Sequence, residues 1–69
     1  MDIIYTDHAE DQLRERRLER VWVEETIRFP DVTEKDGVKH YVTKKLNGFT
    51  LRVVYVKETN IKVITMYWI

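Results

Sequence analysis

The chain contains no cysteine, only one proline and only two glycines among its 69 residues. The lack of cysteine excludes disulfide bonds and thiolate metal sites, and it fits a reducing compartment. The sequence also lacks an apolar run long enough to cross a membrane, and its acidic N-terminus lacks the features of a signal peptide. We therefore expect a cytoplasmic protein that does not associate with a membrane.

The sequence has no excess charge of either sign, because 12 acidic side chains balance 12 basic ones. Zero net charge argues against a uniformly basic nucleic-acid-binding protein. The distribution is uneven, however: residues 1–11 carry acids but no Lys or Arg, and residues 37–52 carry Lys and Arg but no acids. One surface of the folded protein can therefore still be basic.

Four arginines lie between these two regions: Arg14, Arg16, Arg17 and Arg20. They can line a groove for RNA phosphates. They can equally form ion pairs at helical spacing with four nearby glutamates, namely Glu10, Glu15, Glu19 and Glu24. We favour ion pairing for at least half of these arginines.

The C-terminal half predicts three β-strands, over residues 38–46, 49–57 and 61–68. Asn47-Gly48 joins the first two strands, and this dipeptide is typical of a type I′ turn because both residues tolerate positive φ angles. The turn fixes the register, with Thr43 opposite Arg52. For the second hairpin we expect Thr65 opposite Arg52 on the other side.

Alternation along these strands divides the sheet into two faces. One face is apolar and needs a cover: Val42, Leu46, Phe49, Leu51, Val53, Tyr55, Ile64, Met66 and Trp68. The other is open and carries basic, hydroxyl and tyrosine side chains: Lys39, Tyr41, Thr43, Lys45, Thr50, Arg52, Thr65 and Tyr67. At one end of this open face we expect an apolar patch that binds a partner: Val54, Val56, Ile61 and Val63. Alternatively, the first strand or residues 31–36 fold over this patch.

Two short amphipathic helices supply the cover. The first begins at Thr6-Asp7, where either side chain can cap the free backbone N–H groups. The second runs from about residue 19 to residue 28 and ends before Pro30, since the residue before proline avoids the helical region. Their buried positions are Ala9, Leu13, Val23 and Ile27.

A short strand over residues 2–5 precedes the helices, and residues 31–37 follow them as a polar loop. The resulting order is β-α-α-β-β-β. It predicts an α+β fold in one domain, residues 1–69, with two helices packed on one face of a mainly antiparallel sheet. A domain this small has marginal stability on its own, so a partner would help to stabilise it.

Five motifs together resemble a known family: Thr6-Asp7-His8-Ala9, Arg14-Glu15-Arg16-Arg17-Leu18, Phe29-Pro30-Asp31, Leu51-Arg52-Val53-Val54-Tyr55 and Val63-Ile64-Thr65-Met66-Tyr67. They resemble the bacterial and archaeal domain-of-unknown-function family numbered four-two-five-eight, which is similar in element order to the RelE, ParE and BrnT toxins of toxin–antitoxin pairs. The resemblance implies a RelE-like domain, a cognate antitoxin, and cleavage of messenger RNA on or off the ribosome. Family members usually carry Arg-Gly before the second helix. Arg17-Leu18 lacks that glycine, so we expect a tighter or differently shaped turn.

Metal-independent RNA cleavage needs a base, a cation near the phosphate and an acid for the leaving oxygen. We expect Arg52 to hold the phosphate, Lys45 to add a second cation, and Tyr67 or Tyr41 to stack on a base or donate a proton. The expected RNA-binding residues are Lys39, Tyr41, Thr43, Arg14 and Arg17. The simpler interpretation, which we favour over catalysis, is a solvated face whose Lys and Arg stems cover tyrosine rings.

His8 is the candidate base, because a histidine in the first turn of a helix is held neutral by the helix dipole. The alternative, which we favour, is a structural hydrogen bond from His8 to Gln12 or to the preceding strand. His8 and His40 lack metal-ligand spacing with Asp or Glu, so the sequence predicts no metal site and no cofactor.

Two functions follow from these observations. The first is a toxin-like ribonuclease or translation inhibitor, whose partners are RNA or the ribosome and an antitoxin that covers the basic face. The second is a non-enzymatic interaction module that forms a homodimer or a hetero-complex through the apolar patch. Plain RNA binding lies between them and predicts steep salt dependence.

Overall fold

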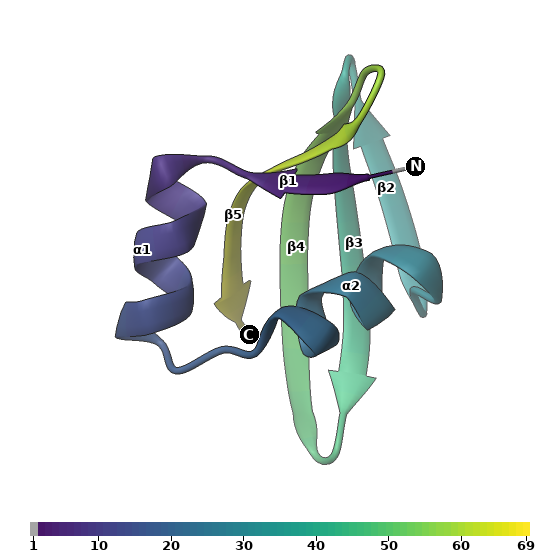
Figure 1. Cartoon of the computed structure of the whole chain (residues 1–69). Helices are drawn as coiled ribbons and strands as arrows, with labels where there is room; N and C mark the ends of the chain where they lie inside the picture. Colours follow the sequence, from purple (N-terminus) through teal and green to yellow (C-terminus); the bar gives the residue numbers. More distant parts are fainter. Residues whose placement is uncertain (1) are drawn as a thin grey trace.

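The computed structural model describes residues 2–69 as two helices and one five-stranded sheet. In chain order the elements are β1 (Ile3–Tyr5), α1 (Asp7–Glu15), α2 (Arg20–Arg28), β2 (Val32–Asp36), β3 (Lys39–Leu46), β4 (Phe49–Lys57) and β5 (Ile61–Trp68). The sheet order is β1-β5-β4-β3-β2, and only the β1–β5 pair is parallel. Both helices lie on the same side of the sheet (Figure 1), which confirms the α+β class. No helix among residues 2–69 has the length and apolar character needed to span a membrane.

The β3–β4 hairpin forms as the sequence predicts. Asn47 and Gly48 have φ angles of 52° and 92°, which are the positive values that a type I′ turn requires. Leu46 lies opposite Phe49, and Thr43 lies opposite Arg52. Side chains alternate between the two faces of this hairpin, so its apolar face lies under the helices and its basic face lies on the open side.

The register expected for the β4–β5 hairpin is wrong. Lys57 pairs with Ile61, and a β-bulge then shifts the pairing by one more residue, so Arg52 lies opposite Tyr67 and not Thr65. The bulge adds an unpaired residue on β5, and this reverses which face the early part of that strand presents. Its physical benefit is burial, because Val63 becomes completely buried in the core.

The polar loop expected over residues 31–37 is instead the edge strand β2. It pairs along its whole length with β3 through the two-residue turn Gly37-Val38, in which Gly37 has a φ of 63°. Every residue of β2 is exposed, so the strand lacks the apolar alternation by which a strand is usually recognised. Charged side chains on such an edge discourage pairing with other chains.

Helix α1 has well-defined ends. The Thr6 hydroxyl accepts a hydrogen bond from the Ala9 N–H at 3.1 Å, so Thr6 is the N-cap. At the other end, the Leu18 N–H donates to the Leu13 carbonyl at 2.9 Å and the Arg17 N–H donates to the Arg14 carbonyl at 3.4 Å. These two bonds, with Arg17 at a φ of 52°, form a Schellman motif, in which a glycine usually occupies the position of Arg17.

The core lies between the helices and the sheet. Its fully or nearly buried members are Ala9, Leu13, Leu18, Val23, Ile27, Val42, Leu51, Val53, Tyr55, Val63 and Met66. Phe49 was expected under the helices but is 68% exposed, because it lies beside the β3–β4 turn. Ile64 was also expected in the covered set, but it is the residue that the bulge leaves unpaired, and its carbonyl accepts a hydrogen bond from the Thr6 hydroxyl at 3.2 Å.

Candidate functional site

Arg52 is the central residue of the open sheet face. Its guanidinium carbon lies 5.3 Å from the centroid of the Tyr41 ring on β3, and its cross-strand neighbour on β5 is Tyr67. The three side chains therefore form a strip across three adjacent strands, with a cation between two phenols. We call Tyr41, Arg52 and Tyr67 the open-face strip. Such a cation and aromatic side chains are suited to a phosphate and to exposed bases.

Glu34 on β2 restrains Arg52. One terminal nitrogen of Arg52 lies 3.2 Å from a Glu34 carboxylate oxygen, and the Arg52 side chain is 26% exposed. The Arg52 Nε is buried and has no hydrogen-bond partner. An incoming phosphate must therefore compete with the carboxylate for the guanidinium. Sequence reasoning missed Glu34 because it assigned residues 31–37 to a loop.

Two lysines extend the open face along β3. Lys39 lies at one end of the strand, opposite Asp36, and Lys45 lies near the other end, opposite Thr50. Both lysines are exposed. Thr43 lies between them and is opposite both Val32 and Arg52. The open face thus has a cation at each end and Arg52 near its centre.

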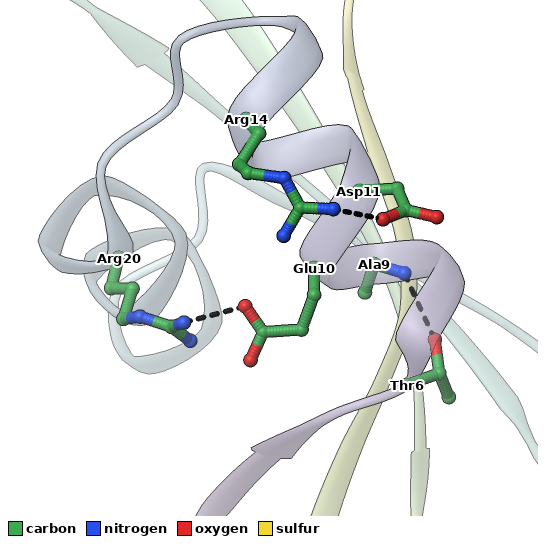
Figure 2. Close-up of polar contacts among 6 residues, drawn as sticks. All are labelled: Thr6, Ala9, Glu10, Asp11, Arg14 and Arg20. Carbon is green, nitrogen blue, oxygen red and sulfur yellow. Dashed lines mark hydrogen bonds and ion pairs between the residues drawn. The ribbon is translucent and has the colours of Figure 1, made fainter.

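The other predicted RNA-contacting residues come from the helical side of the molecule. His8 lies in the first turn of α1, is exposed, and makes no side-chain hydrogen bond within residues 2–69. Arg14 is ion-paired with Asp11 one turn earlier (Figure 2). Arg17 lies in the α1–α2 connection. The structure therefore brings Arg52, Tyr67 and Lys45 together on one face. His8, Arg14 and Arg17 do not lie on that face.

The expected structural bond from His8 to Gln12 or to the preceding strand is absent from residues 2–69, and the Gln12 amide oxygen accepts from the Arg16 Nε at 2.9 Å. Thr6 holds the corner between β1 and α1 instead, through its bonds to Ala9 and Ile64. Within residues 2–69 no group of three or more His or carboxylate side chains is placed to share a metal ion.

The apolar patch expected on the open face is only half present. Val54 and Val56 share the face of Arg52, and Val54 is 5% exposed. Ile61 and Val63 lie on the helical side, opposite Lys57 and Tyr55, because of the altered register. The expectation that Ile61 and Val63 form a partner-binding patch with Val54 and Val56 is therefore wrong in its geometry.

A polar cluster joins the two helices to β1. Arg20 of α2 forms an ion pair with Glu10 of α1 at 2.5 Å (Figure 2), and the guanidinium lies 4.7 Å from the centroid of the Tyr5 ring. Burial raises the pKa of the Tyr5 phenol, and the Glu24 carboxylate raises it further. The hydrogen bond that Arg20 donates to the Glu10 carboxylate raises the pKa of Arg20. Two of the four arginines, Arg14 and Arg20, are thus ion-paired, which agrees with the number expected. The partners differ from the expected glutamates at helical spacing, because Arg14 pairs with Asp11 and Arg20 pairs with Glu10 on the other helix.

A pocket of about 540 Å³ opens on the helical side of the sheet, where the α1–α2 connection approaches the β3–β4 turn. These two segments lie at the same end of the molecule (Figure 1). The lining residues are Arg16, Arg17, Trp22, Leu46, Asn47, Phe49 and Trp68. We call this the aromatic pocket. Sequence reasoning assigned Leu46, Phe49 and Trp68 to the covered face but did not predict a cavity there, because local periodicity does not show where a helix stops short of the sheet.

Comparison with known proteins adds one finding. The family described as Domain of unknown function (DUF4258) matches residues 5–68, which is nearly the whole chain. No curated protein and no solved structure matches this chain. The match covers both helices, strands β2 to β5 and the last residue of β1. The chain therefore belongs to the DUF4258 family.

Proposed function

We propose that this domain is the toxin-like member of a toxin–antitoxin pair, with a RelE-like arrangement, and that it binds and cleaves RNA on the open sheet face. The observation that carries the proposal is the open-face strip, in which Arg52 lies over Tyr41 and opposite Tyr67. The helices leave this face uncovered. Its cations, Lys39, Lys45 and Arg52, outnumber the two carboxylates that β2 places on the same face, Glu34 and Asp36.

This geometry supports RNA binding. The Arg52 fork suits two oxygens of one phosphate, and the tyrosine rings on either side suit the flanking bases. Lys39 and Lys45 extend the positive track along β3. Because a phosphate must displace Glu34 from Arg52, binding exchanges one anionic partner for another, and the affinity depends steeply on salt.

Cleavage would use the same residues. The Glu34 carboxylate accepts the proton of the ribose 2′-OH, and the 2′-oxygen then attacks the adjacent phosphorus. Arg52 stabilises the charge on the phosphate oxygens, and the Tyr67 hydroxyl donates its proton to the departing 5′-oxygen. The products are a 2′,3′-cyclic phosphate and a free 5′-OH. Glu34 replaces His8 as the proposed base, because Glu34 is in contact with Arg52 whereas His8 lies on α1.

A messenger-RNA transcript incubated with the purified domain in EDTA tests the proposal. We expect binding by the wild-type protein and fragments that end in a 2′,3′-cyclic phosphate. Arg52→Ala should abolish cleavage and weaken binding. Arg28→Ala is the matched control, because Arg28 is exposed at the end of α2 and forms no ion pair within residues 2–69. Equal binding and equal cleavage by the wild-type protein and the Arg52 variant would refute the proposed function.

A further inference from the structure

We infer that the aromatic pocket is a docking site for an acidic peptide segment of a partner protein, which packs large apolar side chains against the tryptophans and places a carboxylate on Arg16 and Arg17. The pocket lies on the helical side of the sheet, so this site is separate from the open-face strip. The inference does not depend on RNA binding.

The walls of the pocket are apolar and tilted against one another. The Trp68 ring lies 6.0 Å from the Trp22 ring at an interplanar angle of 59°, and 5.9 Å from the Phe49 ring at 58°. Rings tilted in this way pack closely against one another, and the apolar surface they present suits the aliphatic and aromatic side chains of a protein. The volume of about 540 Å³ lies within the usual range of ligand pockets, about 300–1,000 Å³.

The rim of the pocket carries uncompensated positive charge. The Arg16 Nε donates to the neutral Gln12 amide, and Arg17 forms no ion pair with any residue from 2 to 69. The neighbouring Arg14 and Arg20 differ, because a carboxylate contacts each of them. Charge complementarity therefore selects an acidic partner, and an arginine fork suits a carboxylate.

The backbone at Arg17 supports a binding role for its side chain. Arg17 has a φ of 52°, in the left-handed region that a Schellman motif reserves for glycine. Folding alone would therefore favour glycine at this position. An arginine held in this conformation at the rim of a pocket is the kind of local strain that accompanies binding sites.

Selection of peptides tests the inference. Random dodecapeptides displayed on phage are selected on the immobilised full chain, and the enriched peptides are synthesised. Binding is followed by the emission of Trp22 and Trp68, which are the only two tryptophans of the chain and both line the pocket. We expect the enriched peptides to combine Asp or Glu with Leu, Phe or Trp, and to shift this emission.

Variants then locate the site. Arg17→Gly keeps the fold and should weaken binding of a selected peptide by about tenfold, the loss expected for one charge-assisted hydrogen bond. Arg16→Ala should act in the same direction, whereas Arg28→Ala should have no effect. Because the site is distinct from the open face, Arg52→Ala should leave peptide binding unchanged.

Four results would overturn the inference. They are the absence of enriched peptides, enrichment of basic peptides, unchanged affinity in Arg17→Gly, and occupation of the pocket by another ligand. A concentration-dependent dimer that Phe49→Ser abolishes would assign the pocket to a second copy of the chain. A single-stranded RNA oligonucleotide that shifts the tryptophan emission of the wild-type protein but not of Arg17→Gly would assign it to nucleic acid.

Discussion

Arg52 and Tyr67 lie directly opposite one another on β4 and β5, and they do so because of the bulge farther along the same strand pair. Without the extra residue, Arg52 would lie opposite Met66, one position earlier on β5. The same bulge turns Ile61 and Val63 toward the helices, where Val63 is completely buried. One irregularity thus completes both the core and the open-face strip.

Replacing Glu34 with glutamine should separate the two proposed activities, RNA binding and RNA cleavage. Glu34→Gln removes the carboxylate that competes with phosphate for Arg52, and an exposed ion pair of this kind contributes up to about 1 kcal/mol. We expect RNA affinity to rise by up to about fivefold while cleavage is lost, as measured by fluorescence anisotropy and gel analysis. Asp36→Asn, at another β2 position on the open face, is the control for the change in net charge. Reduced affinity in Glu34→Gln would show that the carboxylate does not compete with RNA.

Replacing Arg17 with glycine should stabilise the protein. The left-handed conformation at this position costs about 1 kcal/mol more for a residue with a Cβ than for glycine. We expect Arg17→Gly to raise the free energy of unfolding by about 0.5–1 kcal/mol in urea titrations. Arg16→Gly is the matched control and should give no gain, because Arg16 has a φ of −99°. A less stable Arg17→Gly variant would show that the contacts of the Arg17 side chain stabilise the fold by more than its left-handed backbone conformation destabilises it.

Thr6 stabilises the junction of β1, α1 and β5. Its hydroxyl accepts from the Ala9 N–H and donates to the Ile64 carbonyl. Thr6→Ala should lower the free energy of unfolding by about 1–3 kcal/mol, the sum of a lost N-cap and a lost partly buried hydrogen bond. Thr6→Ser keeps both bonds and should lose less than half as much. Equal losses in the two variants, measured by thermal denaturation, would assign the effect to the methyl group instead.

The phenol of Tyr5 makes stability fall at alkaline pH. Burial, followed by the effect of Glu24, raises the pKa of Tyr5 in the folded protein. The folded state therefore favours the protonated phenol. Its contribution to stability is complete below about pH 10, the ordinary pKa of tyrosine, and is lost as the pH rises through the folded pKa.

Tyr5→Phe removes this titrating group. The Tyr5 hydroxyl is buried and has no hydrogen-bond partner, so its removal should change the free energy of unfolding at neutral pH by less than about 1 kcal/mol. Above about pH 10 the variant should lose stability more slowly than the wild-type protein. Tyr55→Phe is a useful comparison, because burial also raises the pKa of Tyr55. Parallel pH profiles of the wild-type protein and Tyr5→Phe would contradict the assignment.

Much of this fold follows from strong local signals in the sequence. Asn47-Gly48 predicts the β3–β4 turn and register, and both are confirmed. Thr6-Asp7 predicts the start of α1, Pro30 marks the end of α2, and the buried positions Ala9 and Val23 follow from helical periodicity. These features depend on residues close together in the chain, so a single sequence contains the necessary information.

The remaining features depend on contacts between distant segments. Strand β2 has no buried side chain, and it is a strand because β3 offers it a free edge. The bulge on β5 brings Val63 into a core to which α1 also contributes. The aromatic pocket likewise needs Trp22, Phe49 and Trp68 from three elements. Local periodicity does not encode any of these relationships between distant segments. For the same reason, the sequence alone did not show that His8 and Arg14 lie away from Arg52.

The most direct test of the open-face strip is an NMR titration of the isotope-labelled domain with single-stranded RNA. The Arg52 Nε–H signal and the ring signals of Tyr41 and Tyr67 report on the open face, and the indole N–H signals of Trp22 and Trp68 report on the helical side. If the open face binds RNA, the first group shifts on titration, the indole signals stay in place, and Arg52→Ala abolishes the shifts. Shifts confined to the indole signals, or no shifts at low salt, would contradict RNA binding by the open face.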